Sequence, residues 1–386
     1  MVNARGSVSS WNVRDRGFTP EETRAAEAVL ERRLGGAARI ELAFLGGSFA
    51  VGLGHGTSDI DLYAVGSGLP GSDIVFEHDG IQVHVNPVPA GKVRELVELG
   101  AEYRTTGADR TQIATELKTL NALVRLSTGQ ILHADRRWRE LLDTLDPNVV
   151  RQILITRNAN VFSAYAEDVY GALDVGDLLT AATASDLALQ AGCEAVLAAA
   201  GDVYFGPKFL FRRLARTSAT ASWCDHVWRL THRELHPESG GWPDEVRAIA
   251  EERLWAGGLL LSWSVVEGWH EPLDRLPAPS RPSGTGPRRS VYFAPLRFAD
   301  GWAFVGPEDG YEVAERTVRL WRELDGRALS AVPREDLPDD VKDVGAAVAS
   351  LAAFGAVEGG SAGGEEPDEL IIRRSPRFGC HPKAAS

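Results

Sequence analysis

The chain has 386 residues, of which 44% are hydrophobic and 25% charged, the composition of a globular protein with two or three domains. Its formal net charge of −13 argues against a polynucleotide substrate, because binding to a nucleic-acid backbone needs clustered Lys and Arg. Its three cysteines are widely spaced and its longest apolar run is too short to cross a bilayer, so we expect a cytoplasmic protein without a membrane contact.

The N-terminal third has the pattern of a small α+β domain. Thr19-Pro20-Glu21-Glu22 supplies a cap, a proline and a glutamate for a helix that runs to about Leu34. Apolar strands are predicted at Ile40 to Leu45, Asp59 to Val65, Ile74 to His78 and Ile81 to Asn86. Asp79-Gly80 predicts a tight hairpin turn between the last two.

The loop between the first two strands carries the strongest functional signal. Five glycines leave its backbone N–H groups accessible to phosphate, and Ser48 adds a hydroxyl; the glycines are Gly46, Gly47, Gly52, Gly54 and Gly56. Asp59 and Asp61 follow it and project from one face of the next strand. Two clustered carboxylates repel each other unless a cation lies between them, and oxygen ligands suit Mg²⁺. This pattern predicts phosphoryl or nucleotidyl transfer.

Six positions in this stretch resemble the signature of the DNA polymerase beta type nucleotidyltransferase superfamily: Gly47, Ser48, Gly52, Ser58, Asp59 and Asp61. The resemblance implies that Asp59 and Asp61 hold two Mg²⁺ ions. It also implies that Gly47, Ser48, Gly52 and Ser58 bind a nucleoside triphosphate, with ATP as the expected nucleotide. Capping of a turn by the two aspartates is the structural alternative.

The third carboxylate of that superfamily falls on His84 in this chain. A neutral imidazole is a suitable general base but a poor Mg²⁺ ligand. With a two-residue turn at Asp79-Gly80, Glu77 lies opposite Gln82 on the face of His84, and so is a second candidate for the missing charge. Glu167, Asp186 and Glu194 are further candidates for the base.

Helical periodicity predominates from residue 90 to 271, with predicted helical stretches at Arg110 to Leu126, Asn160 to Leu173, Leu178 to Ala200 and Asp244 to Val266. The Pro207-Lys208-Phe209 element resembles one in the helical domains of standalone, aminoglycoside-modifying nucleotidyltransferases, which implies that Lys208 contacts the triphosphate. Arg212, Arg213 and Arg216 are interpreted as a solvated basic face. Six of the ten tryptophans lie between Trp223 and Trp269, where core packing is expected more often than a stacking surface.

Residues 272–289 are rich in proline and glycine and are expected to form a linker. A β-hairpin pattern at Val291 to Phe298 and Trp302 to Val305 precedes a helix at Glu315 to Leu324 and two further helices up to Val357. Residues 290–358 resemble the PqqD-like winged-helix domain through Tyr311-Glu312-Val313, Leu320-Trp321, Leu324-Asp325-Gly326 and Phe354-Gly355-Ala356-Val357. The resemblance implies recognition of a precursor peptide in natural product biosynthesis. Dimerisation is an alternative role for this module, and disorder is expected at 359–386.

The expected architecture is therefore a nucleotidyltransferase domain at 1–89, a helical bundle at 90–271, a linker and a winged-helix domain. Three functional hypotheses remain open. The first is a Mg²⁺-dependent enzyme that moves an NMP group, AMP by expectation, to a hydroxyl of a peptide or peptide-derived acceptor. The second keeps the chemistry but takes a small, antibiotic-type acceptor. The third is a peptide-binding pseudoenzyme that has lost activity at His84.

Overall fold

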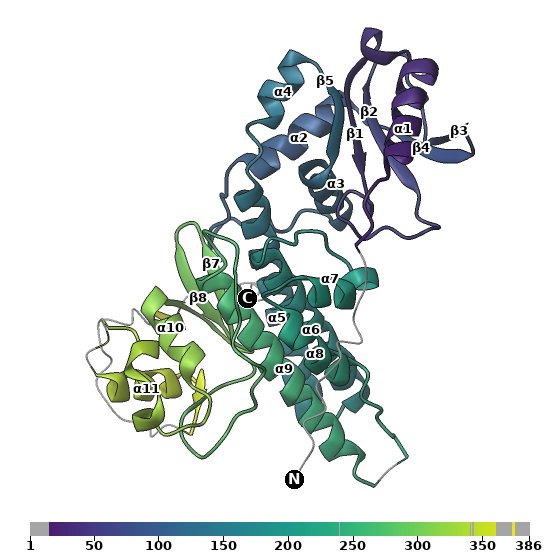
Figure 1. The fold of residues 1–386 in the computed structure, drawn as a ribbon. Coiled ribbons are helices and arrows are strands. Elements are labelled where there is room, and N and C mark those ends of the chain that lie inside the picture. Colours follow the sequence, from purple (N-terminus) through teal and green to yellow (C-terminus); the bar gives the residue numbers. More distant parts are fainter. Residues whose placement is uncertain (1–14, 239, 340, 342, 360–372, 375–386) are drawn as a thin grey trace, which may run out of the picture. The chain divides into compact units, whose positions relative to one another are not determined.

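The structure is a computed structural model, and it describes residues 15–238, 240–339, 341, 343–359 and 373–374 (Figure 1). The fold is α+β. The chain divides into two compact units: the first contains residues 15–103, 115–150 and 203–212, and the second contains the remaining described residues. The first unit thus takes in most of 90–150, and 290–358 belongs to the same unit as the helices of the second.

A five-stranded mixed sheet forms the centre of the first unit, in the order β3-β4-β2-β1-β5. Its strands are β1 (Ile40–Gly46), β2 (Ile60–Gly66), β3 (Ile74–His78), β4 (Ile81–Pro87) and β5 (Gln130–Ala134). Only the β2–β4 pair is parallel within this sheet. The predicted hairpin turn is confirmed, because Asp79 and Gly80 both have positive φ, 50° and 76°.

The strand β5 lies inside the region that the sequence predicts to be helical. It pairs antiparallel with β1, with Leu42 opposite Ala134 and Leu45 opposite Gln130. The helical prediction for this stretch is wrong because the strand is stabilised by pairing with a segment some ninety positions earlier in the sequence, which local periodicity does not report. The predicted helix at Arg110 to Leu126 likewise begins later, at Leu117.

Helices cover both faces of this sheet. Helix α1 (Pro20–Arg33) has the expected capping box, in which Thr19 Oγ1 accepts from the Glu22 N–H and Glu22 accepts from the Thr19 N–H. Its apolar side packs with Ile60, Leu62 and Val83 into one buried core. Helix α3 (Leu117–Thr128) contacts β1. The first unit also contains α2 (Ala90–Ala101) and α4 (Arg136–Leu142), together with 3-10 turns at Gly36–Ala38 and Pro207–Phe209. Because α1 holds one face of β2 in the core, every second β2 residue is directed to the other face.

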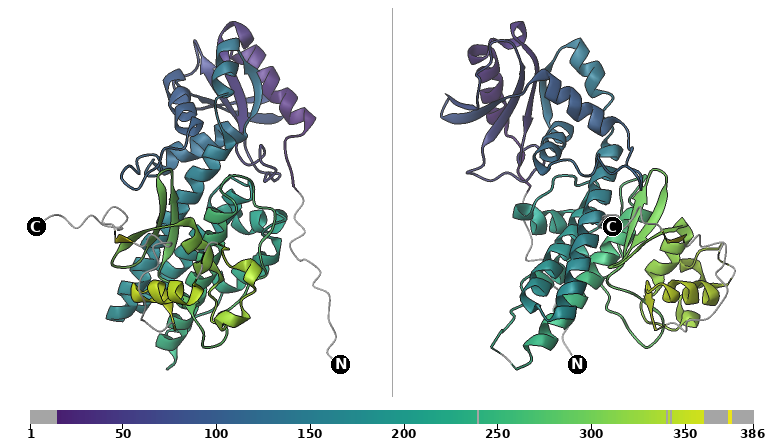
Figure 2. Two further views of the ribbon diagram at one scale, coloured as in Figure 1. Left: turned by 90° about the vertical axis from the view of Figure 1, so that its left-hand side faces the viewer. Right: turned by 180° about the vertical axis from the view of Figure 1, so that it is seen from behind.

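Two long helices, α6 (Leu178–Ala199) and α9 (Trp242–Val266), pack along each other in the second unit (Figure 2). A Cβ atom at Gly192 of α6 would lie 2.7 Å from the backbone of Gly257 in α9, so glycine at this crossing permits the close approach. The other helices here are α5 (Pro147–Val175), which begins in the first unit, α7 (Leu210–Arg216), α8 (Cys224–Thr231) and a 3-10 turn at Ala221–Trp223. Of the six tryptophans from Trp223 to Trp269, three are buried as core packing predicts, Trp223, Trp255 and Trp269, whereas Trp228 is 39% exposed.

The segment at 272–287 has no regular secondary structure, but its backbone is bound to the helices. The indole N–H groups of Trp223 and Trp255 donate to the carbonyl oxygens of Pro277 and Ser280 at 2.8 and 2.9 Å. Leu273 is buried and its N–H donates to Ala199 O at 2.8 Å. These contacts fix the segment against the helical part of its own unit.

A second sheet, in the order β11-β9-β8-β7, follows this segment. Its strands are β7 (Ala294–Phe298), β8 (Gly301–Val305), β9 (Gly310–Val313) and β11 (Arg373–Arg374). Helices α10 (Glu315–Glu323) and α11 (Val344–Ala353) accompany it, and β6 (Arg288–Arg289) pairs with β10 (Val357–Glu358). Between the helices the structure has short 3-10 turns at Leu329–Ala331 and Arg334–Asp336, so of the two further helices predicted there only α11 is an α-helix. The expectation of disorder at 359–386 is wrong for Arg373–Arg374, which form β11 and pair with β9; apart from these residues and Gly359 it lies outside the described residues.

Candidate active site

The glycine loop starts where β1 ends, and its first residue, Gly47, lies next to the side chain of Asp61. Gly47 has φ +80°, a backbone conformation that favours glycine. A Cβ atom built on Gly47 would lie 2.7 Å from Oδ2 of Asp61, closer than real Cβ atoms approach an oxygen. Gly47 is therefore required twice over, for its backbone conformation and for the space beside the Asp61 carboxylate.

Two arginines from distant parts of the first unit hold the loop in place. The Arg16 N–H donates to Gly52 O at 2.9 Å, and Arg16 O accepts from the Gly54 N–H at 3.1 Å. On Arg212, Nη1 donates to Leu53 O at 2.8 Å. Within the loop the Leu53 N–H donates to Ser48 O at 2.8 Å. These bonds fix the loop backbone, but they use the N–H groups of Leu53 and Gly54, and the Gly52 N–H donates to Phe49 O at 3.1 Å. The expectation that Gly52 and Gly54 leave their N–H groups accessible to phosphate is therefore wrong.

The two aspartates and His84 meet at the same end of the sheet. Asp61 lies directly between Gly46 of β1 and His84 of β4 in the strand register. Asp59 precedes β2, and its Oδ1 is 3.5 Å from Nε2 of His84. The Asp59 side chain is 66% exposed, whereas Asp61 is half-buried. The structure thus brings together three of the residues that the sequence singled out.

Burial and charge act on Asp61 in opposite directions. Burial raises the pKa of Asp61, and the negative charge of Asp59 raises it further. Arg125, His84 and a side-chain hydrogen bond with Asn86 lower that pKa, but the net shift is upward. An ionised Asp61 in this place is stabilised by any additional cation, which is the electrostatic property expected of a metal ligand.

Sequence reasoning missed three side chains around Asp61. Asn86 lies two residues after His84 on the same face of β4, opposite Tyr63. The Arg125 guanidinium, from α3, lies 5.9 Å from the centre of the Tyr63 ring. Burial and the Asp61 charge raise the pKa of Tyr63 to about 12, so its hydroxyl stays protonated. The alternation of side chains along β2 and β4 could have predicted that Tyr63 and Asn86 lie on the face of Asp61. The position of Arg125 next to this face depends on tertiary packing.

The remaining predicted site residues lie in different surroundings. Glu77 is opposite Gln82, as the hairpin predicted, and is exposed on the outer strand β3. The Ser58 hydroxyl accepts from the His55 N–H at 3.0 Å and so closes a turn of the loop. Lys208 is exposed, with its Nζ 4.9 Å from the centre of the Phe209 ring. Among the described residues no contact joins Glu77 or Lys208 to Asp59 or Asp61.

The interpretation of Arg212, Arg213 and Arg216 as a solvated basic face is wrong. Arg212 binds the glycine loop, and the Arg213 side chain is 0% exposed. Arg213 Nη1 donates to Glu194 at 2.7 Å and its Nε donates to Asp202 at 2.9 Å, while Arg216 also pairs with Asp202. The side chains of these three arginines point to different sides of a short helix. Buried carboxylates of the second unit form ion pairs with Arg213 and Arg216. Glu194 is therefore engaged in a buried ion pair.

The described residues hold no group of three or more His, Cys, Asp or Glu side chains arranged to bind a metal ion. No described helix is both long and apolar enough to cross a membrane. No family model matches the chain, and no curated protein does. Among solved structures, the chain is similar to a nucleotidyltransferase-like protein from Exiguobacterium sibiricum, with a TM-score of 0.33 and 12% sequence identity over 64% of this chain and 79% of the other.

Proposed function

We propose that the chain is a Mg²⁺-dependent nucleotidyltransferase that moves an NMP group from a nucleoside triphosphate, ATP by expectation, to an acceptor hydroxyl. The observation that carries this proposal is the contact between Gly47 and Asp61. It places the start of the glycine loop, after β1, beside a carboxylate of β2 that is suited to a metal.

The donor set fits Mg²⁺. Asp59 and Asp61 offer carboxylate oxygens on neighbouring positions, and Mg²⁺ in proteins is commonly bound by one or two carboxylates with the rest of its shell from substrate phosphates and water. Bound Mg²⁺ would neutralise charge on the triphosphate and the departing pyrophosphate.

In the proposed reaction the acceptor oxygen attacks the α-phosphorus, and the bond from that phosphorus to the pyrophosphate oxygen breaks. His84 takes the proton of the acceptor hydroxyl. Asp59, 3.5 Å from His84 Nε2, stabilises the imidazolium that results. Gly47 and Ser48, at the start of the loop, would bind the phosphates. Glu77 and Lys208 stay predictions, without an assigned contact to the substrate.

Calorimetric titration of the full chain with ATP, GTP, CTP and UTP, with and without Mg²⁺, tests the nucleotide site. We expect Mg²⁺-dependent binding that Asp61→Asn abolishes and Glu27→Gln, an exposed change on α1, leaves intact. Binding in wild type and loss of transfer in His84→Gln would assign the base. Failure of every nucleotide to bind would refute the enzyme and favour a pseudoenzyme.

For the acceptor, we propose a hydroxyl of a peptide or peptide-derived molecule. The support is the edge of β9, which already pairs with an extended segment, since Glu312 and Tyr311 lie opposite Arg373 and Arg374. A peptide that took the place of β11 would bind this edge by main-chain hydrogen bonding. Transfer of label from α-labelled ATP to Ser- and Thr-containing peptides would support this acceptor. Transfer only to small aminoglycosides would favour the antibiotic-type alternative.

A further inference from the structure

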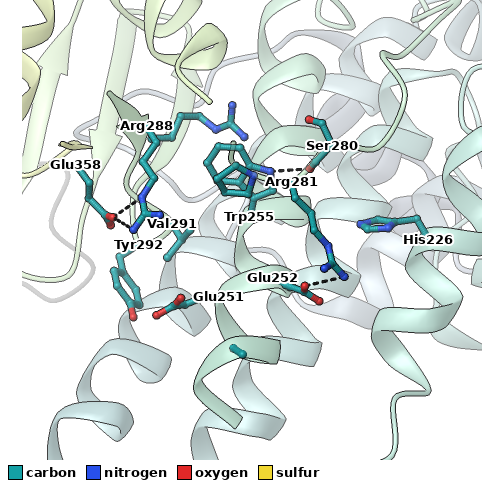
Figure 3. A pocket seen from close by; sticks show the side chains of 13 residues that line it. His226, Glu251, Glu252, Trp255, Ser280, Arg281, Arg288, Val291, Tyr292 and Glu358 are labelled. Atoms are coloured by element: carbon teal, nitrogen blue, oxygen red, sulfur yellow. Dashed lines mark hydrogen bonds and ion pairs between the residues drawn. The ribbon is translucent and has the colours of Figure 1, made fainter. Parts of the chain in front are cut away.

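The second unit contains a cavity of about 320 Å³ that the proposed nucleotidyl transfer does not use. One wall is a face of α9 carrying Ala248, Glu251 and Trp255, and the opposite wall is the chain from Ser280 to Tyr292 (Figure 3). The volume lies at the small end of the range for ligand sites, so the cavity suits a ligand the size of an amino acid. Apolar lining from Trp255, Val291 and Pro282 is interrupted by charged groups.

Most of the charges around this cavity neutralise each other. Arg288 pairs with Glu358 at 2.7 Å, and Arg281 pairs with Glu252 at 2.8 Å; both pairs are drawn in Figure 3. In each pair the two opposite charges neutralise each other at the edge of the cavity. Two lining groups of opposite charge, Arg289 and Glu251, are left outside these pairs.

Arg289 is a cation held in a largely apolar place. The residue is only 3% exposed, and its guanidinium lies 3.7 Å from the centre of the Trp255 ring. Its Nη1 donates to Arg322 O at 2.6 Å, but its Nη2 has no hydrogen-bond partner among the described residues. Burial lowers the pKa of Arg289 to about 9. A buried guanidinium with an unsatisfied N–H group gains more from an added anion than an exposed one does.

Glu251 is the complementary group. The described residues give it no ion pair, and burial together with the nearby Glu358 raises its pKa. It lies on the same wall as Trp255, one helical turn earlier along α9. Glu251 is exposed at the mouth of the cavity, where Arg247 and Arg288 lower its pKa, and an added cation beside it would relieve the repulsion from Glu358.

We propose that this cavity is a binding site for a small zwitterion of the amino-acid class, with its carboxylate on the Arg289 side and its ammonium group on the Glu251 side. The site presents one cation and one anion that lack full partners, and a dipolar ligand complements both at once. Its bound state would fix the segment from Ser280 to Tyr292 against α9. The proposal is independent of the nucleotidyl transfer proposed above.

The test is calorimetric titration of the full chain with the standard L-amino acids, each compared with its methyl ester and its N-acetyl derivative. We expect at least one free amino acid to bind. The dissociation constants of its methyl ester and its N-acetyl derivative should be higher by about tenfold or more. Binding should also raise the thermal midpoint, since a ligand that binds only the folded state stabilises it.

Three variants locate the binding. Ala248→Phe fills the cavity from an exposed helix position without a change of charge, and is expected to abolish binding while the chain stays folded. Glu251→Gln should weaken binding of the free amino acid and of its methyl ester, which both keep the ammonium group, but should leave binding of the N-acetyl derivative, which lacks that charge, unchanged. Asp244→Asn, exposed on the same helix and outside the cavity, is the matched control. No binding of any amino acid to wild type, or binding that Ala248→Phe leaves intact, would overturn the proposal.

Discussion

Substitution of Gly47 by alanine probes the contact on which the proposed active site depends. Two costs arise in the structure. Alanine at φ +80° occupies the left-handed region, at a cost of about 1–2 kcal/mol. The new methyl group would also lie 2.7 Å from Asp61 Oδ2, so the carboxylate or the loop must move. Together we expect a loss of about 1–3 kcal/mol in local stability, the range for strained backbone positions.

The functional loss should exceed the loss of stability. Asp61 is held between Gly46 and His84, so displacement of its carboxylate moves a proposed metal ligand relative to Asp59. We expect Mg²⁺-dependent ATP affinity to fall by about tenfold or more, equivalent to about 1.4 kcal/mol. Calorimetry measures the affinity, and hydrogen exchange of the β1 and β2 amides reports the local free energy of opening.

Gly56→Ala is the matched control within the same loop. A Cβ atom at Gly56 meets no atom within 4 Å, and Gly56 has no positive φ. Neither stability nor ATP affinity should change in this variant. If Gly47→Ala bound MgATP as tightly as wild type, or if both glycine variants were affected equally, the reasoning from the Gly47–Asp61 contact would be refuted.

Three further predictions concern charged groups. The pKa of Asp61 is raised in the folded state, so its ionised form lowers the stability of the fold above that pKa, and this loss is recovered as pH falls through the pKa. Asp61→Asn should therefore raise the thermal midpoint near pH 7 while it abolishes Mg²⁺-dependent ATP binding. A lowered midpoint would contradict this sign. Arg213→Met leaves Glu194 without its cation and Asp202 with Arg216 alone, so denaturant unfolding should show a loss of about 3–5 kcal/mol. Arg24→Met, whose pair with Glu21 is exposed, should leave the free energy of unfolding almost unchanged. Arg212→Met removes the hydrogen bond to the glycine loop and should weaken ATP binding with little change in global unfolding; unchanged affinity would show that the loop holds its shape without Arg212.

Local sequence determined the elements around the site. The capping box at Thr19, the Asp79-Gly80 turn and the strands on either side of the glycine loop were predicted within one or two residues. Each depends on residues close together in the chain: a side chain that binds the next turn of a helix, or backbone conformations that few residues adopt. The position of Glu77 opposite Gln82 followed from the two-residue turn and is confirmed by the register of β3 and β4.

Tertiary structure decided what lies beyond that local range. Strand β5 forms because it pairs with the edge of β1. Arg212 binds the glycine loop instead of facing solvent with the neighbouring basic residues. Arg213 is buried because it forms ion pairs with Glu194 and Asp202. A sequence by itself records that an arginine is present but not which carboxylate or carbonyl group will neutralise its charge. That choice depends on contacts between segments distant in the chain, where hydrogen bonding and burial outweigh local propensity.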